Sequence, residues 1–210
     1  MARDAAVALG FATHSGWAAV VALGVVEGVP YVAARERIEM AEPRQPESRQ
    51  PFHAVEGLPV EAAAKRLATY RAQAERMASE QIQAIVGRLR AVRQQVVGIG
   101  LLESSGRKGI PLASILASHA LIHTADGDHF RDAIAVVADG LGLRVERVAS
   151  RAVTTDAANA LGMTPAGLQA RIQQLGREVG PPWAADQKAA AAVAWLVVAR
   201  QAERGRRTRG

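Results

Sequence analysis

Cysteine is absent from this chain of 210 residues, and aromatic residues make up only 4% of it. Without cysteine there is no disulfide, no thiolate zinc site and no cysteine nucleophile. This composition is compatible with a reducing compartment, and we expect a cytoplasmic protein. Because aromatic rings are scarce while 49% of the residues are hydrophobic, the core must consist mainly of alanine, valine, leucine and isoleucine.

Long apolar runs are also missing. No stretch of the chain reaches the roughly 18 uninterrupted apolar residues of a membrane-spanning helix, so no membrane association is expected. The apolar segment near the N-terminus is not typical of a secretory signal, because Asp4 and the polar residues 13–15 interrupt it. A chain of this length can bury one substantial core, and we predict a single domain over residues 1–203.

Acidic residues are outnumbered by basic ones, with 20 Asp and Glu against 26 Lys and Arg, which gives a net charge of +6. The excess gathers at the end of the chain, where Arg204, Arg206 and Arg207 lie in a basic tail predicted over residues 204–210. Such an arm is attracted to phosphate backbones, so nucleic acid is the predicted partner. The plainer interpretation is a solvated terminal run.

The pattern of apolar residues predicts an α/β domain. Residues 10–23, 25–32 and 35–40 are β-prone and favour three antiparallel strands, with a hairpin turn near Glu27 and Gly28. Residues 41–59 contain several prolines and few apolar side chains, which predicts a flexible linker inside the domain.

Helical and strand patterns alternate through the rest of the chain. The predicted elements are a helix at 60–94, a strand at 95–103, helices at 111–123 and 128–140, a strand at 143–148, and helices from about 156, 165 and 183. Alternation of this kind favours parallel pairing of the later strands. We therefore predict a mixed sheet, with three antiparallel strands followed by parallel strands, and flanking helices.

This order of elements resembles the RNase H-like superfamily, and within it the RuvC-type resolvase branch. The resemblance covers roughly residues 10–200 and includes Glu103 at the end of the fourth strand and Asp186 at the start of the last helix. It implies a metal-dependent endonuclease, in which carboxylates from the first strand, fourth strand and last helix bind two divalent metal ions. Glu103 and Asp186 would be the catalytic residues and ligands, Mg²⁺ or Mn²⁺ the cofactor, and nucleic acid the substrate.

The predicted first strand departs from the pattern of that family, since it contains no Asp or Glu. The expected acidic position falls within residues 11–14, where His14 is a candidate metal ligand. An imidazole with two carboxylates would bind a metal more weakly and favour a softer ion. The sequence therefore leaves open a non-cleaving relative that still binds nucleic acid.

A second group of candidate ligands follows the fourth strand. His119 and His123 are four residues apart, so one face of a helix can carry both, and histidine pairs with a carboxylate bind Zn²⁺ or iron. Ala120 stands where the zinc-protease motif requires Glu, which removes the general base of that motif. A histidine-based metal enzyme of another kind is thus an alternative function.

Two further expectations concern partners. Arg107 and Lys108 lie in a loop with glycine on both sides, where they could contact phosphate, although the loop lacks the ending of a Walker motif. A non-catalytic assembly module with the same fold is the remaining alternative. Its homodimer surface would come from the helix at 60–94 or from the alanine-rich last helix.

Overall fold

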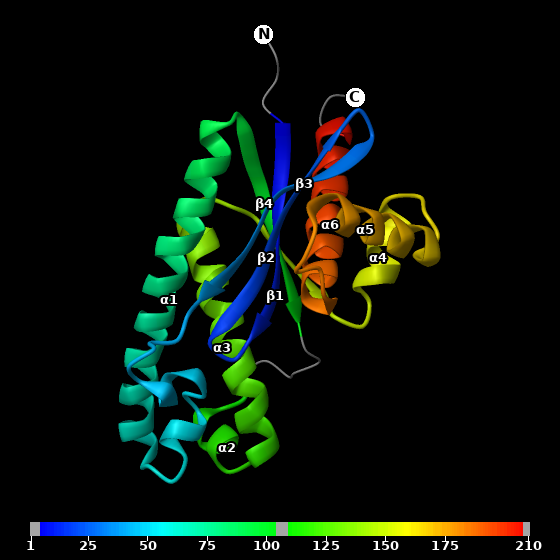
Figure 1. Ribbon diagram of the computed structural model, residues 1–210. Helices are drawn as coiled ribbons and strands as arrows, with labels where there is room; N and C mark the ends of the chain where they lie inside the picture. The colour runs from blue at the N-terminus through cyan, green and yellow to red at the C-terminus, as the bar shows by residue number, and fades with distance from the viewer. Residues whose placement is uncertain (1–4, 104–108, 208–210) are drawn as a thin grey trace.

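The computed structural model describes residues 5–103 and 109–207, which form a five-stranded mixed sheet between two layers of helices (Figure 1). The strands β1 (Ala5–His14), β2 (Trp17–Val26) and β3 (Val29–Glu39) form an antiparallel meander. The strands β4 (Gln94–Glu103) and β5 (Val145–Ala149) add to it in parallel, in the order β3-β2-β1-β4-β5. The predicted fold class is confirmed.

The meander differs from its prediction in one turn. The hairpin at Glu27 and Gly28 is present, but a second turn at Ser15 and Gly16 divides the segment 10–23, and β1 begins earlier, at Ala5. The apolar pattern concealed this turn because Trp17 resumes the β-prone run directly after it. The turn pairs His14 with Trp17 across the hairpin, which matters for the site described below.

Each face of the sheet is covered by its own helices. The helices α1 (Val60–Ala91) and α3 (His119–Gly140), the latter preceded by the short α2 (Leu112–Leu116), cover one face (Figure 1). The helices α4 (Val153–Ala160), α5 (Pro165–Val179) and α6 (Ala185–Arg207) cover the other. Since side chains of a strand alternate between faces, Phe11 packs with α1 and α3 whereas Ala12 packs with α6.

The last helix lies unusually close to the two central strands, because these strands present glycine to it. A Cβ atom added at Gly10 would lie 1.9 Å from the carbonyl oxygen of Ala190, and one added at Gly100 would lie 2.6 Å from Val193. The residues from Ala190 to Val198 are all buried in this contact. The alanine-rich face that the sequence offered as a dimer surface is therefore covered by the sheet of the same chain.

Residues 41–59, predicted to be a flexible linker, are folded against the helices. They contain two short 3-10 helices, η1 (Pro46–Arg49) and η2 (His53–Val55). Phe52 and Val55 are buried beside α1 and α3. The high proline content concealed these few apolar side chains, which are enough to attach the segment to the domain.

The C-terminal helix also extends further than predicted, to Arg207, so it includes part of the predicted basic tail.

Two sequence signals mark the start of α5. Thr164 Oγ1 accepts a hydrogen bond of 3.1 Å from the Gly167 amide, and Pro165 follows this N-cap. Within the described ranges, no helix has both the length and the apolar character needed to cross a membrane.

Candidate functional site

Two elements bring candidate site residues together at one edge of the sheet. His14 is the last residue of β1, and Asp186 lies in the first turn of α6. The His14 Nε2 atom lies 3.0 Å from Asp186 Oδ1, and both side chains are partly exposed. The structure thus joins two of the residues that the sequence selected.

A contact between β3 and the loop that precedes α6 helps to position Asp186. The guanidinium of Arg35 on β3 donates to the carbonyl oxygens of Gly180, Pro181 and Pro182, with the Pro181 bond at 3.0 Å. These three carbonyls belong to the loop between α5 and α6. Because an arginine fork holds this loop, the start of α6 is fixed relative to β3.

His14 is also part of a stack of planar groups. Its ring lies over the indole of Trp17, with centroids 4.3 Å apart and planes 12° apart. The guanidinium carbon of Arg37 lies 3.9 Å from the centroid of the same indole, and Arg37 also binds Glu39. We call the residues His14, Trp17 and Arg37 the edge stack. It is built by β1, β2 and β3 together and lies on the face covered by α6.

Glu103 points to the opposite face of the sheet. Leu102 before it packs with α4, α5 and α6, so strand alternation sends the Glu103 side chain toward α3. Arg147 Nη1 donates to Glu103 Oε1 at 2.9 Å, and its Nη2 donates to Asp132 Oδ1 on α3 at 2.9 Å. Glu103 therefore binds Arg147, which also binds Asp132, on the face of the sheet opposite to the one that carries Asp186.

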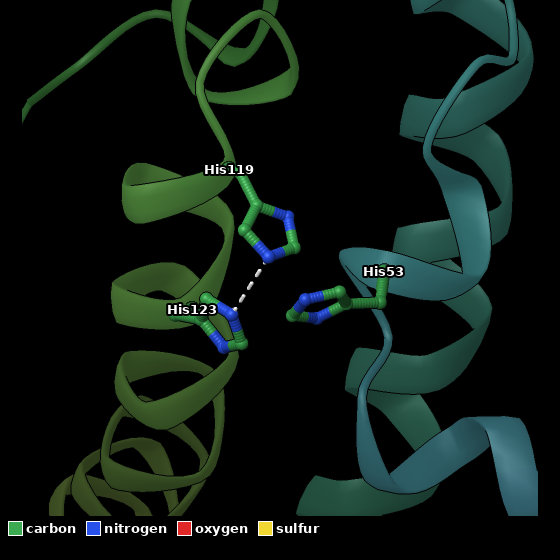
Figure 2. A group of neighbouring side chains, drawn as sticks. All are labelled: His53, His119 and His123. Atoms are coloured by element: carbon green, nitrogen blue, oxygen red, sulfur yellow. Dashed lines mark hydrogen bonds between the residues drawn. The ribbon is translucent and has the colours of Figure 1, made fainter.

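A third group of candidate residues lies at the start of α3 (Figure 2). His119 and His123 both project from this helix, and their Nε2 atoms are 3.1 Å apart. His53 projects toward them from η2, and one ligand nitrogen from each histidine lies within 4.8 Å of the other two. His119 and His123 are exposed, whereas His53 is half-buried. The structure thus brings together the two predicted histidines and adds a third.

A buried carboxylate orients the third histidine. Asp126 Oδ2 lies 2.5 Å from His53 Nδ1, and Asp126 Oδ1 accepts a hydrogen bond of 2.7 Å from the Phe52 amide. Burial raises the pKa of Asp126, and these two hydrogen bonds act in the opposite direction. Since Nδ1 faces the carboxylate, the Nε2 atom of His53 remains available to the group.

No protein-family model matches the chain, and no curated protein matches it. Solved structures do: T. thermophilus RuvC in complex with Holliday junction substrate aligns with a TM-score of 0.53 and 11% identity, over 94% of this chain and 95% of that chain. The Thermus thermophilus RuvC structure aligns with a TM-score of 0.52 and 11% identity, over 95% and 96%. The chain has a RuvC-like RNase H fold. The likeness covers nearly all of both chains and, at this identity, establishes the fold.

The RuvC-like fold implies divalent metals at the sheet edge, which require suitable ligands there. Mg²⁺ ions need several converging oxygen ligands. On the face covered by α6, the strand ends provide Ala12, His14 and Leu102, and the helix provides Asp186. At this edge Asp186 lies beside an imidazole and apolar side chains, and the carboxylate of Glu39 on β3 is paired with Arg37. These residues do not fit a pair of Mg²⁺ or Mn²⁺ ions.

The predicted nucleic-acid contacts are distributed differently. Arg107 and Lys108 lie outside the described residues. Arg204 donates to Glu146 Oε1 at 2.6 Å, so its charge is partly offset. Arg206 and Arg207 are exposed in the last turn of α6.

A cavity of about 240 Å³ lies beside α3, and charged residues line part of it: Arg71, Asp128, Asp132 and Arg147. His129 also lines it and is buried, with no hydrogen-bond partner for Nε2 among the described residues. Burial lowers the pKa of His129 from 6.5 to about 4. His129 is therefore neutral near pH 7.

Sequence reasoning missed His53 and two members of the edge stack, Trp17 and Arg37. His53 lies 73 positions before Asp126, in a segment without a clear periodic pattern, so nothing local connects the two. Trp17 and Arg37 could be placed together only with the strand register, which pairs β2 with β3.

Proposed function

We propose that this RuvC-like domain binds structured nucleic acid at the sheet edge and does not hydrolyse it by a two-metal mechanism. The observation that supports the proposal is the edge stack, which lies next to Asp186 where the fold implies metal ions. A planar imidazole, an indole and a guanidinium at one edge favour contacts with bases and phosphates over coordination of a hard cation.

The physical chemistry of the edge stack suits an exposed or splayed base. His14 is 42% exposed and Arg37 is 53% exposed, so a base can contact the stack without displacing core residues. Stacking of one base on an aromatic side chain contributes about 1–3 kcal/mol to binding. A net charge of +6 adds a sequence-independent attraction for phosphates.

The choice of a branched substrate rests on the RuvC neighbour, whose structure contains a Holliday junction substrate. We expect a four-way DNA junction to be retarded at lower protein concentration than a duplex of the same length in a gel mobility assay. Retardation of neither DNA at low salt, in the presence or absence of Mg²⁺, would contradict the proposal.

The edge stack is tested with Trp17→Leu, and Trp183→Phe serves as the matched control because Trp183 packs over Gly176 between α5 and α6. We expect Trp17→Leu to weaken junction binding by about tenfold, equivalent to about 1.4 kcal/mol, and the control to leave it unchanged. Incubation with Mg²⁺ or Mn²⁺ should leave the DNA intact. Cleavage that Asp186→Asn abolishes would instead support the two-metal mechanism.

A further inference from the structure

The three histidines near the start of α3 form a separate site, on the side of the sheet opposite the edge stack. We propose that His53, His119 and His123 bind one Zn²⁺ ion, and that the ion fastens the segment 41–59 to α3. This inference is independent of nucleic-acid binding, because none of the three histidines belongs to the sheet edge.

The spacing of the nitrogen atoms suits a tetrahedral ion. Zinc–nitrogen bonds of about 2.0–2.1 Å in a tetrahedron place neighbouring ligand nitrogens about 3.3 Å apart. The His119 and His123 Nε2 atoms are 3.1 Å apart, and the ligand nitrogens of all three residues lie within 4.8 Å. A small rotation of the His53 ring would therefore complete the set of three ligands.

The surroundings of His53 distinguish this site from a chance pair of surface histidines. A zinc-bound histidine usually donates its other ring N–H to a carboxylate, which fixes the tautomer and the orientation of the ring. Asp126 meets that condition, because its Oδ2 atom faces His53 Nδ1 and its other oxygen is held by the Phe52 amide. The Asp126 side chain is only 3% exposed, so it cannot turn toward solvent.

The ligand set also indicates what the site can do. Three neutral imidazoles are the ligands of several zinc sites that keep a fourth position for water or substrate. His119 and His123 are exposed, so a fourth position here faces solvent. The carboxylate-poor set disfavours Mg²⁺ and Ca²⁺, which prefer oxygen ligands.

The test is a calorimetric titration of chelator-treated full-length protein with ZnCl₂ near pH 7.5. We expect one Zn²⁺ per chain and an increase in the melting temperature with bound zinc. Alanine substitution of His119, His123 or His53 should abolish stoichiometric binding. Asp126→Asn should weaken it by about 10–100-fold, because the orienting carboxylate is lost.

His14→Ala and His129→Gln are the matched controls, since each removes a histidine outside the group, and both should bind zinc like the native chain. Circular dichroism confirms that the variants fold; His119 and His123 are exposed, so their replacement leaves the core intact. Zinc binding that persists in His53→Ala at native affinity would reduce the site to a surface histidine pair and overturn the proposal. The absence of binding at millimolar zinc would overturn it as well.

Discussion

The five histidines of the chain have three different environments. His14 stacks on Trp17 and contacts Asp186, His129 is buried and neutral, and the other three converge at the start of α3. Environment rather than residue type therefore assigns each imidazole its chemistry. One is suited to contact a planar ligand, three are suited to a metal ion, and one affects stability.

The depressed pKa of His129 predicts a defined pH dependence of stability. The folded chain holds His129 with a pKa of about 4, whereas the unfolded chain titrates near 6.5. Between these values the unfolded state binds the extra proton, so stability falls as pH decreases from about 6.5 toward 4. The full loss from this group is about 3 kcal/mol.

Urea unfolding of the native chain and of His129→Gln, at several pH values from 7 to 4, checks this prediction. Subtracting the two curves cancels the titration of other groups. We expect the stability advantage of the native chain to shrink steadily as pH falls. Two parallel curves would show that His129 does not titrate in this way.

From the contacts of Glu103 we expect its replacement to change the stability of the fold rather than catalysis. Its carboxylate accepts from Arg147, which in turn binds Asp132, and the side chains of Glu103 and Arg147 are mostly buried. Glu103→Gln should lower the free energy of unfolding by about 1–2 kcal/mol, because a charge-assisted hydrogen bond is weakened.

Junction binding by Glu103→Gln should remain native in the mobility assay. Asp132→Asn, which alters the outer partner of Arg147, provides a milder comparison because its side chain is 61% exposed. A Glu103→Gln protein of native stability that has lost a Mg²⁺-dependent activity would return Glu103 to the role implied by the sequence resemblance.

At the scale of elements, the contact of α6 with β1 and β4 determines how closely the two layers approach. Gly10 and Gly100 leave no side chain between the strands and the helix backbone, so Ala190 and Val193 rest directly on the sheet. Close-packed interiors tolerate added atoms poorly, since neighbouring backbones cannot yield. This contact also holds the helix that carries Asp186.

Gly10→Ala is therefore expected to destabilise the fold by at least about 2–3 kcal/mol, because its new Cβ atom would overlap the Ala190 carbonyl. Gly87→Ala is the matched control: Gly87 is exposed on α1, with nothing within 4 Å of an added Cβ. It should stabilise the chain by about 0.5–1 kcal/mol through higher helix propensity. Chemical denaturation measures both, and equal effects of the two substitutions would contradict the argument.

Much of the fold was predictable at this scale, and the failures have identifiable causes. The long pattern from 60 onward predicted α1 well, and Thr164 with Pro165 marked the start of α5. The face to which Glu103 points was not predictable, because a shift of one residue along a strand reverses the direction of every side chain. His53 could not be assigned to the candidate metal site, since only tertiary packing brings η2 to α3.

At the scale of the whole molecule, several basic residues gather at the C-terminal end of α6. Arg200 and Arg204 share the Glu146 carboxylate, and Arg206 and Arg207 follow in the last turn of α6. A charged helix end of this kind adds phosphate contacts without sequence preference. It should therefore contribute to affinity for any nucleic acid, whereas the edge stack should contribute to the preference for a branched one.

The charge argument predicts a change in salt dependence. Replacing both Arg206 and Arg207 with Gln should make the slope of log K against log salt shallower by about 1–2, since each lost phosphate contact reduces it by nearly one. Arg76→Gln is the control, because Arg76 lies on α1 in a surface ion pair with Glu80. Fluorescence anisotropy at several salt concentrations, from about 50 to 200 mM, gives the slopes. An unchanged slope in the double variant would exclude this end of α6 from binding.

The strand order has a consequence for how the chain is made. β1 lies in the middle of the sheet, with β2 beside it almost at once but β4 beginning only at Gln94. At about 5–20 residues per second, the ribosome reaches β4 roughly 4–16 s after finishing β1. During that interval the nascent hairpin exposes an unpaired, apolar edge, which is a template for association with other chains. The edge of β1 is therefore open to association with other chains until β4 has been synthesised and pairs with it.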